Sequence, residues 1–126
     1  MLTLELYLKL KSRAESKYPE IVKSTRLMGG KTTQPNKPRI YFINGSFLDV
    51  WLTPDGDYSY HWESILQDGS IHRWDNAPDH PQIATFPKHF HEGSSENVKE
   101  GHISGDSEEA IVEILDFIKA KLKTHD

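Results

Sequence analysis

Cysteine is absent from the 126-residue chain. This absence excludes a disulfide framework, a thiolate zinc site and a cysteine nucleophile. Long apolar runs are absent too, because nowhere do the roughly eighteen apolar residues of a membrane-spanning helix follow one another. Without such a run, a signal-peptide pattern or disulfides, we expect a cytoplasmic protein that contacts no membrane.

Three widespread motifs are also missing, namely the P-loop, the nucleophile elbow G-x-S-x-G and the dinucleotide fingerprint G-x-G-x-x-G. Their absence excludes the commonest nucleotide-binding and hydrolase classes. A net charge of −4 and a sequence pI near 5.9 argue against a broadly basic nucleic-acid binder. A local basic patch remains compatible with this charge.

The composition that is present suits one globular core. Hydrophobic residues make up 36% of the chain and charged residues 27%, a balance typical of folded rather than disordered proteins. A chain of this length supports one core but not two. We therefore expect a single domain over residues 1–126.

The periodicity predicts an α+β fold, in which an antiparallel sheet of four to five strands, built from two hairpins, is packed by an N-terminal and a C-terminal helix. Helices are expected over 2–16 and 107–123. The second begins at capping residues and carries an apolar stripe at helical spacing. A short β-prone piece covers 21–28, and the irregular segment 75–105 holds at most one short strand near 88–91.

The first hairpin is predicted from the pair Asn44-Gly45, which lies between the β-rich runs 39–43 and 46–52. Such a pair favours a two-residue type I′ turn, in which Tyr41 would face Leu48. Both faces of the hairpin are then apolar. Because the helices can cover only one face, we expect a homodimer or a stable hetero-complex to cover the other.

The second hairpin is predicted across Asp68-Gly69, with strands over 58–65 and 70–74. In this register His61 lies opposite Asn76. We expect the loop 77–91 to fold over the strand end and to bring the remaining histidines to a hydrogen-bonded Arg73 and Asp75. The predicted faces are His61, Glu63, His72 and Trp74 on one side, and Arg73 and Asp75 on the other.

Six of the seven histidines fall between residues 61 and 102. A cleft with two histidines can supply both a general acid and a general base. An arginine beside them can bind phosphate oxygens in bidentate fashion. The candidate catalytic residues are His61, Arg73, Asp75, His80, His89 and His91, and the candidate substrate-binding residues are Trp74 and Asn76.

Several of these residues also suit structural roles. Asp75 or Asn76 can cap the turn that follows the strand, and Trp74 can belong to the core. A zinc site is a further alternative, with His89 and His91 on one side of an extended segment and His80 or Asp75 as a third ligand. No established metal motif has this spacing, so we predict neither a metal nor another cofactor.

The order of rare residues over 58–93 resembles the TumE family of toxins. The resemblance rests on YHW at 60–62, DG at 68–69, HRWDNAP at 72–78, HP at 80–81, and FP at 86–87 followed by spaced histidines. The chain departs from the family pattern at Asp79 and Lys88, where the family often has a further histidine. The family motif falls on His61, Trp62, Arg73, Trp74, Asp75, Asn76, Pro78, His80, Pro81, Pro87, His89 and His91.

The resemblance implies a small cytosolic toxin that is encoded beside a helix-turn-helix antitoxin and inhibits growth by acting on RNA or translation. Our first hypothesis is a metal-independent ribonuclease with an RNA substrate. The alternatives are a non-enzymatic protein-interaction module and a metal-assisted hydrolase that uses the histidine cluster. Convergence of the histidines beside Arg73 would favour an enzyme, whereas dispersed histidines would favour a binding module.

Overall fold

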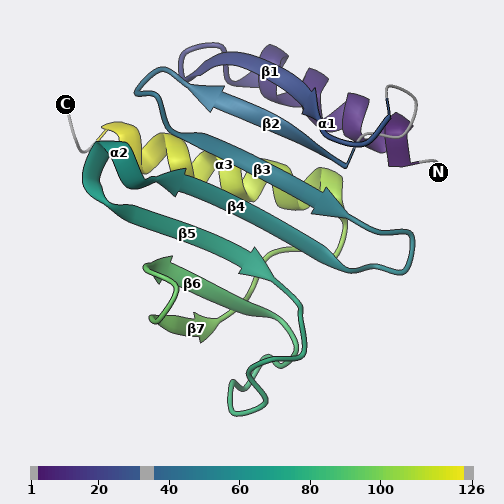
Figure 1. Ribbon diagram of the computed structural model, residues 1–126, viewed down its shortest axis with the longest axis vertical. Helices are drawn as coiled ribbons and strands as arrows, with labels where there is room; N and C mark the ends of the chain where they lie inside the picture. Colours follow the sequence, from purple (N-terminus) through teal and green to yellow (C-terminus); the bar gives the residue numbers. More distant parts are fainter. Residues whose placement is uncertain (1–2, 32–35, 124–126) are drawn as a thin grey trace.

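The structure, a computed structural model, describes residues 3–31 and 36–123. It contains an antiparallel sheet whose strands are neighbours in the order in which they occur in the sequence, β1-β2-β3-β4-β5-β6-β7. Two long helices, α1 and α3, lie on the same face of this sheet (Figure 1). The strands are β1 (Val22–Met28), β2 (Lys37–Phe42), β3 (Phe47–Leu52), β4 (Tyr58–Ser64), β5 (Ser70–Asp75), β6 (His89–Gly93) and β7 (Val98–Glu100); the helices are α1 (Thr3–Lys17), α2 (Ile65–Asp68) and α3 (Ser107–Lys123).

The α+β class is confirmed, but the sheet has seven strands rather than the predicted four to five. The additional pairing comes from β6 and β7, which form a hairpin within the segment expected to be irregular. These strands are short and rich in polar residues, so they show little of the apolar alternation from which strands are predicted. Their importance for the site is that β6 pairs with β5 along its whole length.

Both predicted long helices are confirmed. The expected start of the first helix at Leu2 lies outside the described residues, and α3 has the predicted bounds. The Asp106 carboxylate accepts a hydrogen bond from the Glu108 amide at 3.0 Å and so caps α3. Tyr18, directly after α1, donates its hydroxyl proton to the Asp116 carboxylate at 2.7 Å and thereby fastens the end of α1 to α3. In the described part of the chain, no helix is long and apolar enough to cross a membrane.

The core lies between the helices and one face of the sheet. Strand residues at every second position are buried there, as the alternating burial of β2, β3 and β4 shows. Each fully buried aliphatic or aromatic side chain stabilises the fold by about 1.5 to 3 kcal/mol relative to an exposed one. The buried residues of this face include Ile40, Phe42, Leu48, Val50, Tyr60, Trp62 and Trp74, which pack with Ile111, Ile114, Leu115 and Ile118 of α3.

The first hairpin has a different register from the one predicted. Tyr41 pairs with Phe47, not with Leu48, because three residues rather than two connect the strands. The Phe42 amide donates to the Ser46 carbonyl, and Gly45 has a φ of 91° while Asn44 does not have a positive φ. A turn of this kind needs only one left-handed residue. The one-residue shift places Ile40 and Phe42 on the same face as Leu48 and Val50.

The predicted register of the second hairpin is also wrong. The residues 65–68 form the one-turn helix α2, and Gly69 ends it in the left-handed conformation with a φ of 81°. Ser64 therefore pairs with Ser70, and His61 pairs with Arg73 instead of Asn76. This shift of three residues exchanges the two faces of β5 relative to β4. His72 and Trp74 join the core, while Arg73 and Asp75 join His61 on the opposite face.

Candidate catalytic site on the open face of the sheet

The face of the sheet that α1 and α3 do not cover, called here the open face, carries the candidate catalytic residues. Consecutive strand pairings place five polar side chains in one row across β2 to β6. Side chains directly opposite each other in such pairings are about 4.5 to 5.5 Å apart at Cβ. The row consists of Arg39, Asp49, His61, Arg73 and His91, and a second row beside it consists of Trp51, Ser59, Asp75 and His89.

The centre of the first row is a hydrogen bond between Arg73 and His61. The Nε–H of Arg73 donates to Nδ1 of His61 at 3.1 Å. Burial, followed by the positive charge of Arg73, lowers the pKa of His61 below its ordinary value. A neutral His61 that accepts at Nδ1 carries its proton at Nε2. Its one free lone pair is thus already engaged in orienting Arg73.

This arrangement leaves the outer part of the Arg73 guanidinium available. Within the described residues, no hydrogen bond engages its two terminal nitrogens. Arg73 is partly exposed and stands directly across the strand pair from His91. An arginine whose Nε is held while its terminal nitrogens face outward can bind two oxygens of a phosphate group.

A cavity of about 400 Å³ extends from Arg73 across the open face toward β2. At its far end the Asp49 carboxylate accepts hydrogen bonds from Arg39 at 2.7 Å and from Lys37 at 2.7 Å. Burial alone would raise the pKa of Asp49, but the hydrogen bonds from Arg39 and Lys37 outweigh it and hold the pKa below its usual value. The lining residues are Lys37, Arg39, Asp49, Trp51, Ser59, His61, Glu63 and Arg73.

Three histidines converge at the other side of Arg73. His89 and His91 lie on β6, and His80 comes from the loop between β5 and β6. Ring centroids of His80 and His89 are 4.7 Å apart, and those of His89 and His91 are 4.9 Å apart. One imidazole nitrogen from each of the three residues lies within 4.8 Å of the others. We call these three side chains the histidine cluster.

Asp75 joins the histidine cluster from β5. Its Oδ1 is 2.9 Å from Nε2 of His89, and its Oδ2 is 3.8 Å from Nε2 of His91. Oδ1 also accepts a hydrogen bond from the Ala77 amide at 3.0 Å. Asp75 therefore both caps the turn after β5 and faces the cluster, which combines the two roles weighed for it from the sequence.

Backbone carbonyls fix the orientation of two imidazoles. Nδ1 of His89 is 3.0 Å from the Pro87 carbonyl oxygen, and Nδ1 of His91 is 2.9 Å from the Ser95 carbonyl oxygen. A carbonyl can only accept, so each Nδ1 carries a proton. Burial lowers the pKa of His91 and outweighs the hydrogen bond to Ser95, which would raise it. The lowered pKa favours a neutral ring.

The predicted hydrogen bond between Arg73 and Asp75 is not what the structure shows. Arg73 instead binds His61, and Asp75 faces His89. The expected approach of the loop 77–91 is present, because this loop carries His80 to the strands. His61, Arg73, Asp75, His80, His89 and His91 thus lie on or beside the same face.

The two candidate substrate-binding residues lie elsewhere. Trp74 is 6% exposed on the helix-covered face, where its ring stacks on Phe90 at a centroid distance of 4.7 Å. The side-chain amide of Asn76 accepts from the Tyr58 amide and donates to the Gly56 carbonyl. Asn76 thus fastens the end of β5 to the turn between β3 and β4.

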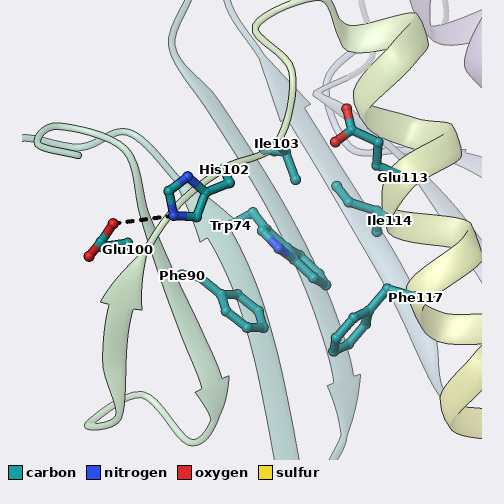
Figure 2. Close-up of a pocket in the computed structure, with 8 residues that line it drawn as sticks. All are labelled: Trp74, Phe90, Glu100, His102, Ile103, Glu113, Ile114 and Phe117. Carbon is teal, nitrogen blue, oxygen red and sulfur yellow. Dashed lines mark ion pairs between the residues drawn. The ribbon is translucent and has the colours of Figure 1, made fainter. Parts of the chain in front are cut away.

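A second cavity, of about 270 Å³, lies on the helix side between β6 and α3 (Figure 2). Its walls are largely apolar and include the rings of Trp74, Phe90 and Phe117. The polar pair there joins His102 to Glu100 at 3.3 Å, and His102 is mostly exposed. No member of the histidine cluster lines this cavity, so the convergent polar chemistry belongs to the open face.

Most of the chain matches a known protein family. The family model described as "Toxin TumE" matches residues 11–122, which is most of the chain. The chain belongs to the TumE toxin family. The match extends well beyond the 58–93 segment and includes every strand of the open face. Searches of curated proteins and of solved structures gave no match.

For this TumE family member, the sequence interpretation missed the polar residues of β2 and β3. Lys37 and Arg39 alternate with buried residues along β2, and Asp49 stands between two buried residues in β3. That alternation is typical of a half-buried strand with a polar outer face. Only with the correct register of both hairpins do the polar positions of β2 and β3 fall on the same face as His61 and Arg73.

Proposed function

We propose that the protein is the growth-inhibiting toxin of a toxin–antitoxin pair and that it acts on RNA at its open face. Membership in the TumE toxin family supports the first part. The observation that carries the second is the Arg73 guanidinium, held at Nε by His61 and placed between that residue and the histidine cluster. This is an arrangement suited to a phosphodiester.

Arg73 is the proposed phosphate-binding residue. Its terminal nitrogens match the spacing of two phosphate oxygens, and its charge would stabilise the additional negative charge of a five-coordinate phosphorus transition state. Lys37 and Arg39 would extend this positive surface along the cavity, although Asp49 neutralises part of their charge. The cavity therefore suits a short single strand of RNA better than an extended RNA duplex.

The histidine cluster is the proposed source of acid–base chemistry. In RNA cleavage, the 2′-oxygen attacks phosphorus, the bond from phosphorus to the 5′-oxygen breaks, and a 2′,3′-cyclic phosphate and a 5′-hydroxyl result. A base must remove the 2′-hydroxyl proton, and an acid must protonate the departing 5′-oxygen. His80 is the most exposed member of the cluster, so it is the imidazole placed to reach the substrate. His61 acts as a positioning residue for Arg73.

Induced expression in bacterial cells tests this function. The Arg73→Ala variant should lose growth inhibition while keeping its thermal midpoint, and RNA from cells expressing the unmodified chain should carry new 2′,3′-cyclic phosphate ends. Arg13→Ala is the matched control, because Arg13 is exposed on α1, on the other side of the sheet. Undiminished toxicity of a folded Arg73→Ala variant would contradict the proposed site. Growth inhibition without new RNA ends would instead favour an interaction module.

We further propose a helix-turn-helix antitoxin as the partner and the cytoplasm as the place of action. A toxin family implies an antitoxin, and co-expression of the neighbouring reading frame should restore growth and retain the toxin on an affinity column. Recovery of growth without a physical complex would contradict a protein partner of this kind.

The oligomeric state stays a prediction. The corrected register places Ile40 and Phe42 in the core together with Leu48 and Val50, so the open face of the first hairpin is less apolar than expected. It still presents Trp51, which is 45% exposed, and the Phe47 ring lies only 3.9 Å from the Arg39 guanidinium carbon. Sedimentation of the isolated protein as a homodimer that Trp51→Ser weakens would support self-association.

A further inference from the structure

The space between Asp75 and the histidine cluster has an unusual set of facing atoms. Because Nδ1 of both His89 and His91 must donate to a carbonyl, Nε2 of each ring is the nitrogen left to face Asp75. Those two nitrogens lie 2.9 and 3.8 Å from the carboxylate oxygens. Lone pairs and carboxylate charge that face one another repel, so either a proton or a metal ion must lie between them.

We propose that this space is a binding site for one divalent transition-metal ion, held by His80, His89, His91 and Asp75. Three imidazoles and a carboxylate form a ligand set that suits zinc and related ions in a tetrahedral arrangement. The inference rests on ligand geometry alone and stands whether or not the protein cleaves RNA. It replaces the expectation, drawn from the unfamiliar spacing in the sequence, that no metal is bound.

The carbonyl contacts of the two β6 histidines are what a metal site requires. Ligating histidines almost always donate their second ring nitrogen to a carbonyl or carboxylate, which fixes the tautomer and the ring orientation. Pro87 and Ser95 supply such carbonyls at 3.0 and 2.9 Å. The Ala77 amide likewise orients Asp75 by its bond to Oδ1. Three of the four ligands are therefore held in place by the backbone.

The distances require only a small adjustment on binding. Tetrahedral ligands at about 2.0 to 2.2 Å from an ion lie roughly 3.4 Å from one another. The three histidine nitrogens lie within 4.8 Å of one another. His89 and His91 are fixed on a strand, whereas His80 sits in the loop between β5 and β6 and is partly exposed. On binding, His80 therefore moves toward the other ligands, and Asp75 Oδ1 must move away from His89 Nε2, which it approaches to 2.9 Å in the structure.

Burial distinguishes this group from a chance surface cluster. His89 is 2% exposed, and His91 and Asp75 are each 7% exposed. Three polar side chains removed from water need partners, because an unsatisfied buried polar group is costly. The simplest rival is a single proton shared between Asp75 and His89, which would leave the His91 nitrogen 3.8 Å from the nearest Asp75 oxygen.

The position of the ion has a consequence for chemistry. Arg73 pairs with His91 across the strands, so an ion in the cluster would lie beside the proposed phosphate site. If both proposals hold, four protein ligands fill the tetrahedral site and engage the imidazole lone pairs, so the ion adds positive charge beside the phosphate and the base comes from outside the cluster.

Metal titration of the purified, untagged and chelator-treated protein tests the site. Cobalt(II) should bind at one ion per chain and give the visible absorption bands of a tetrahedral complex, and zinc(II) should displace it and raise the thermal midpoint. His80→Ala should weaken zinc binding by about a hundredfold or more, since loss even of an outer hydrogen-bond partner costs 10- to 100-fold. His102→Ala is the control, because His102 is 72% exposed at its side chain and lies outside the cluster.

Three outcomes would overturn the inference: absence of cobalt bands, a zinc affinity that His80→Ala leaves unchanged, or equal weakening by His102→Ala. Because His91→Ala removes a buried side chain and can unfold the protein, the partly exposed His80 carries the test and Asp75→Asn supplements it. Growth inhibition plays no part in these readouts. Failure of metal binding thus leaves the Arg73 test of the proposed function intact.

Discussion

Arg73 and His61 face each other across β4 and β5, and the Nε–H of Arg73 donates to Nδ1 of His61 at 3.1 Å. This bond makes His61 an acceptor for arginine and not a free base. It fixes the plane of the guanidinium, since Nε and the terminal nitrogens of arginine are coplanar. The pair therefore separates two tasks, orientation by His61 and anion binding by Arg73.

The Arg73→Lys variant should lose most of its growth inhibition although it keeps the positive charge. Lysine can neither bind two phosphate oxygens with a planar fork nor donate from an Nε held by His61. Loss of one such stabilising donor lowers a catalytic rate by about 10² to 10³. The rate of RNA cleavage by purified protein measures the effect, and Arg13→Lys on α1 serves as the matched control. A fully active Arg73→Lys variant would show that charge alone suffices.

His61→Phe and His61→Asn separate positioning from catalysis. Phenylalanine keeps a ring but removes the acceptor, and we expect about a tenfold to hundredfold loss of activity, smaller than for Arg73→Ala. Asparagine offers a carbonyl oxygen as acceptor and should restore part of the activity. If His61 instead transferred a proton, neither variant would be active, so equal and complete inactivation of both would refute the positioning role. Colony counts after induction and cleavage rates provide the comparison.

Trp62→Ala should destabilise the fold by about 3 to 5 kcal/mol, because it removes a buried ring. Trp62 is 4% exposed, and its indole N–H donates to the buried Ser46 hydroxyl at 2.9 Å. Trp51→Ala is the control, since Trp51 lies on the open face and is 45% exposed. Urea unfolding should show a large shift of the midpoint for the first variant and a small one for the second. Similar shifts for the two variants would contradict the burial of Trp62 and the exposure of Trp51.

The protein should lose stability as the pH falls below about 6.5. Burial, followed by Lys121, lowers the pKa of His72, and burial also lowers that of His61. Below the unfolded pKa of about 6.5 the unfolded chain binds protons that the folded chain does not, so acid favours unfolding. Above that pH both states hold neutral imidazoles, and this contribution is constant.

His72 allows a specific test of this pH dependence. Its ring stacks on Trp62 at a centroid distance of 5.1 Å, and among the described side chains its Nδ1 is a buried nitrogen without a hydrogen-bond partner. His72→Phe keeps a stacking ring and removes the titrating group. The decrease of the thermal midpoint between pH 7 and pH 5 should become less steep in this variant. An unchanged slope would assign the effect to other groups.

Much of the fold followed from the sequence because its signals are local. Asp106 and the apolar stripe gave α3 its bounds, and the β-rich runs gave the strands of both hairpins. The registers did not follow, because Asp68-Gly69 can either form a hairpin turn or end a helix. Gly69 ends α2 with its amide bonded to the Ile65 carbonyl at 3.0 Å. Only the folded structure shows whether Asp68-Gly69 forms a hairpin turn or ends a helix.

The six candidate catalytic residues lie on or beside one face, as expected, but their arrangement differs from the predicted one, and their catalytic role stays a prediction. Rare residues in a family-like order pointed to His61, Arg73 and the histidines, whereas which side chains meet depended on the register and on β6. An error of three residues in one hairpin placed His61 and Arg73 on opposite faces, although they are bonded neighbours. The carbonyl contacts of His89 and His91 could not be predicted, because every residue has a backbone carbonyl and the sequence does not indicate which one accepts a hydrogen bond.

Each strand of the sheet pairs with the strand that precedes or follows it in the chain. Such pairing between strands that follow one another keeps most contacts close in the sequence and favours rapid folding. During synthesis, the residues of the open face are therefore all made before α3, whose Ile111, Ile114, Leu115 and Ile118 are fully buried behind them. Until that helix leaves the ribosome, the nascent sheet exposes an apolar face that is prone to aggregation. Completion of α3 is thus the step of synthesis after which this apolar face can be covered.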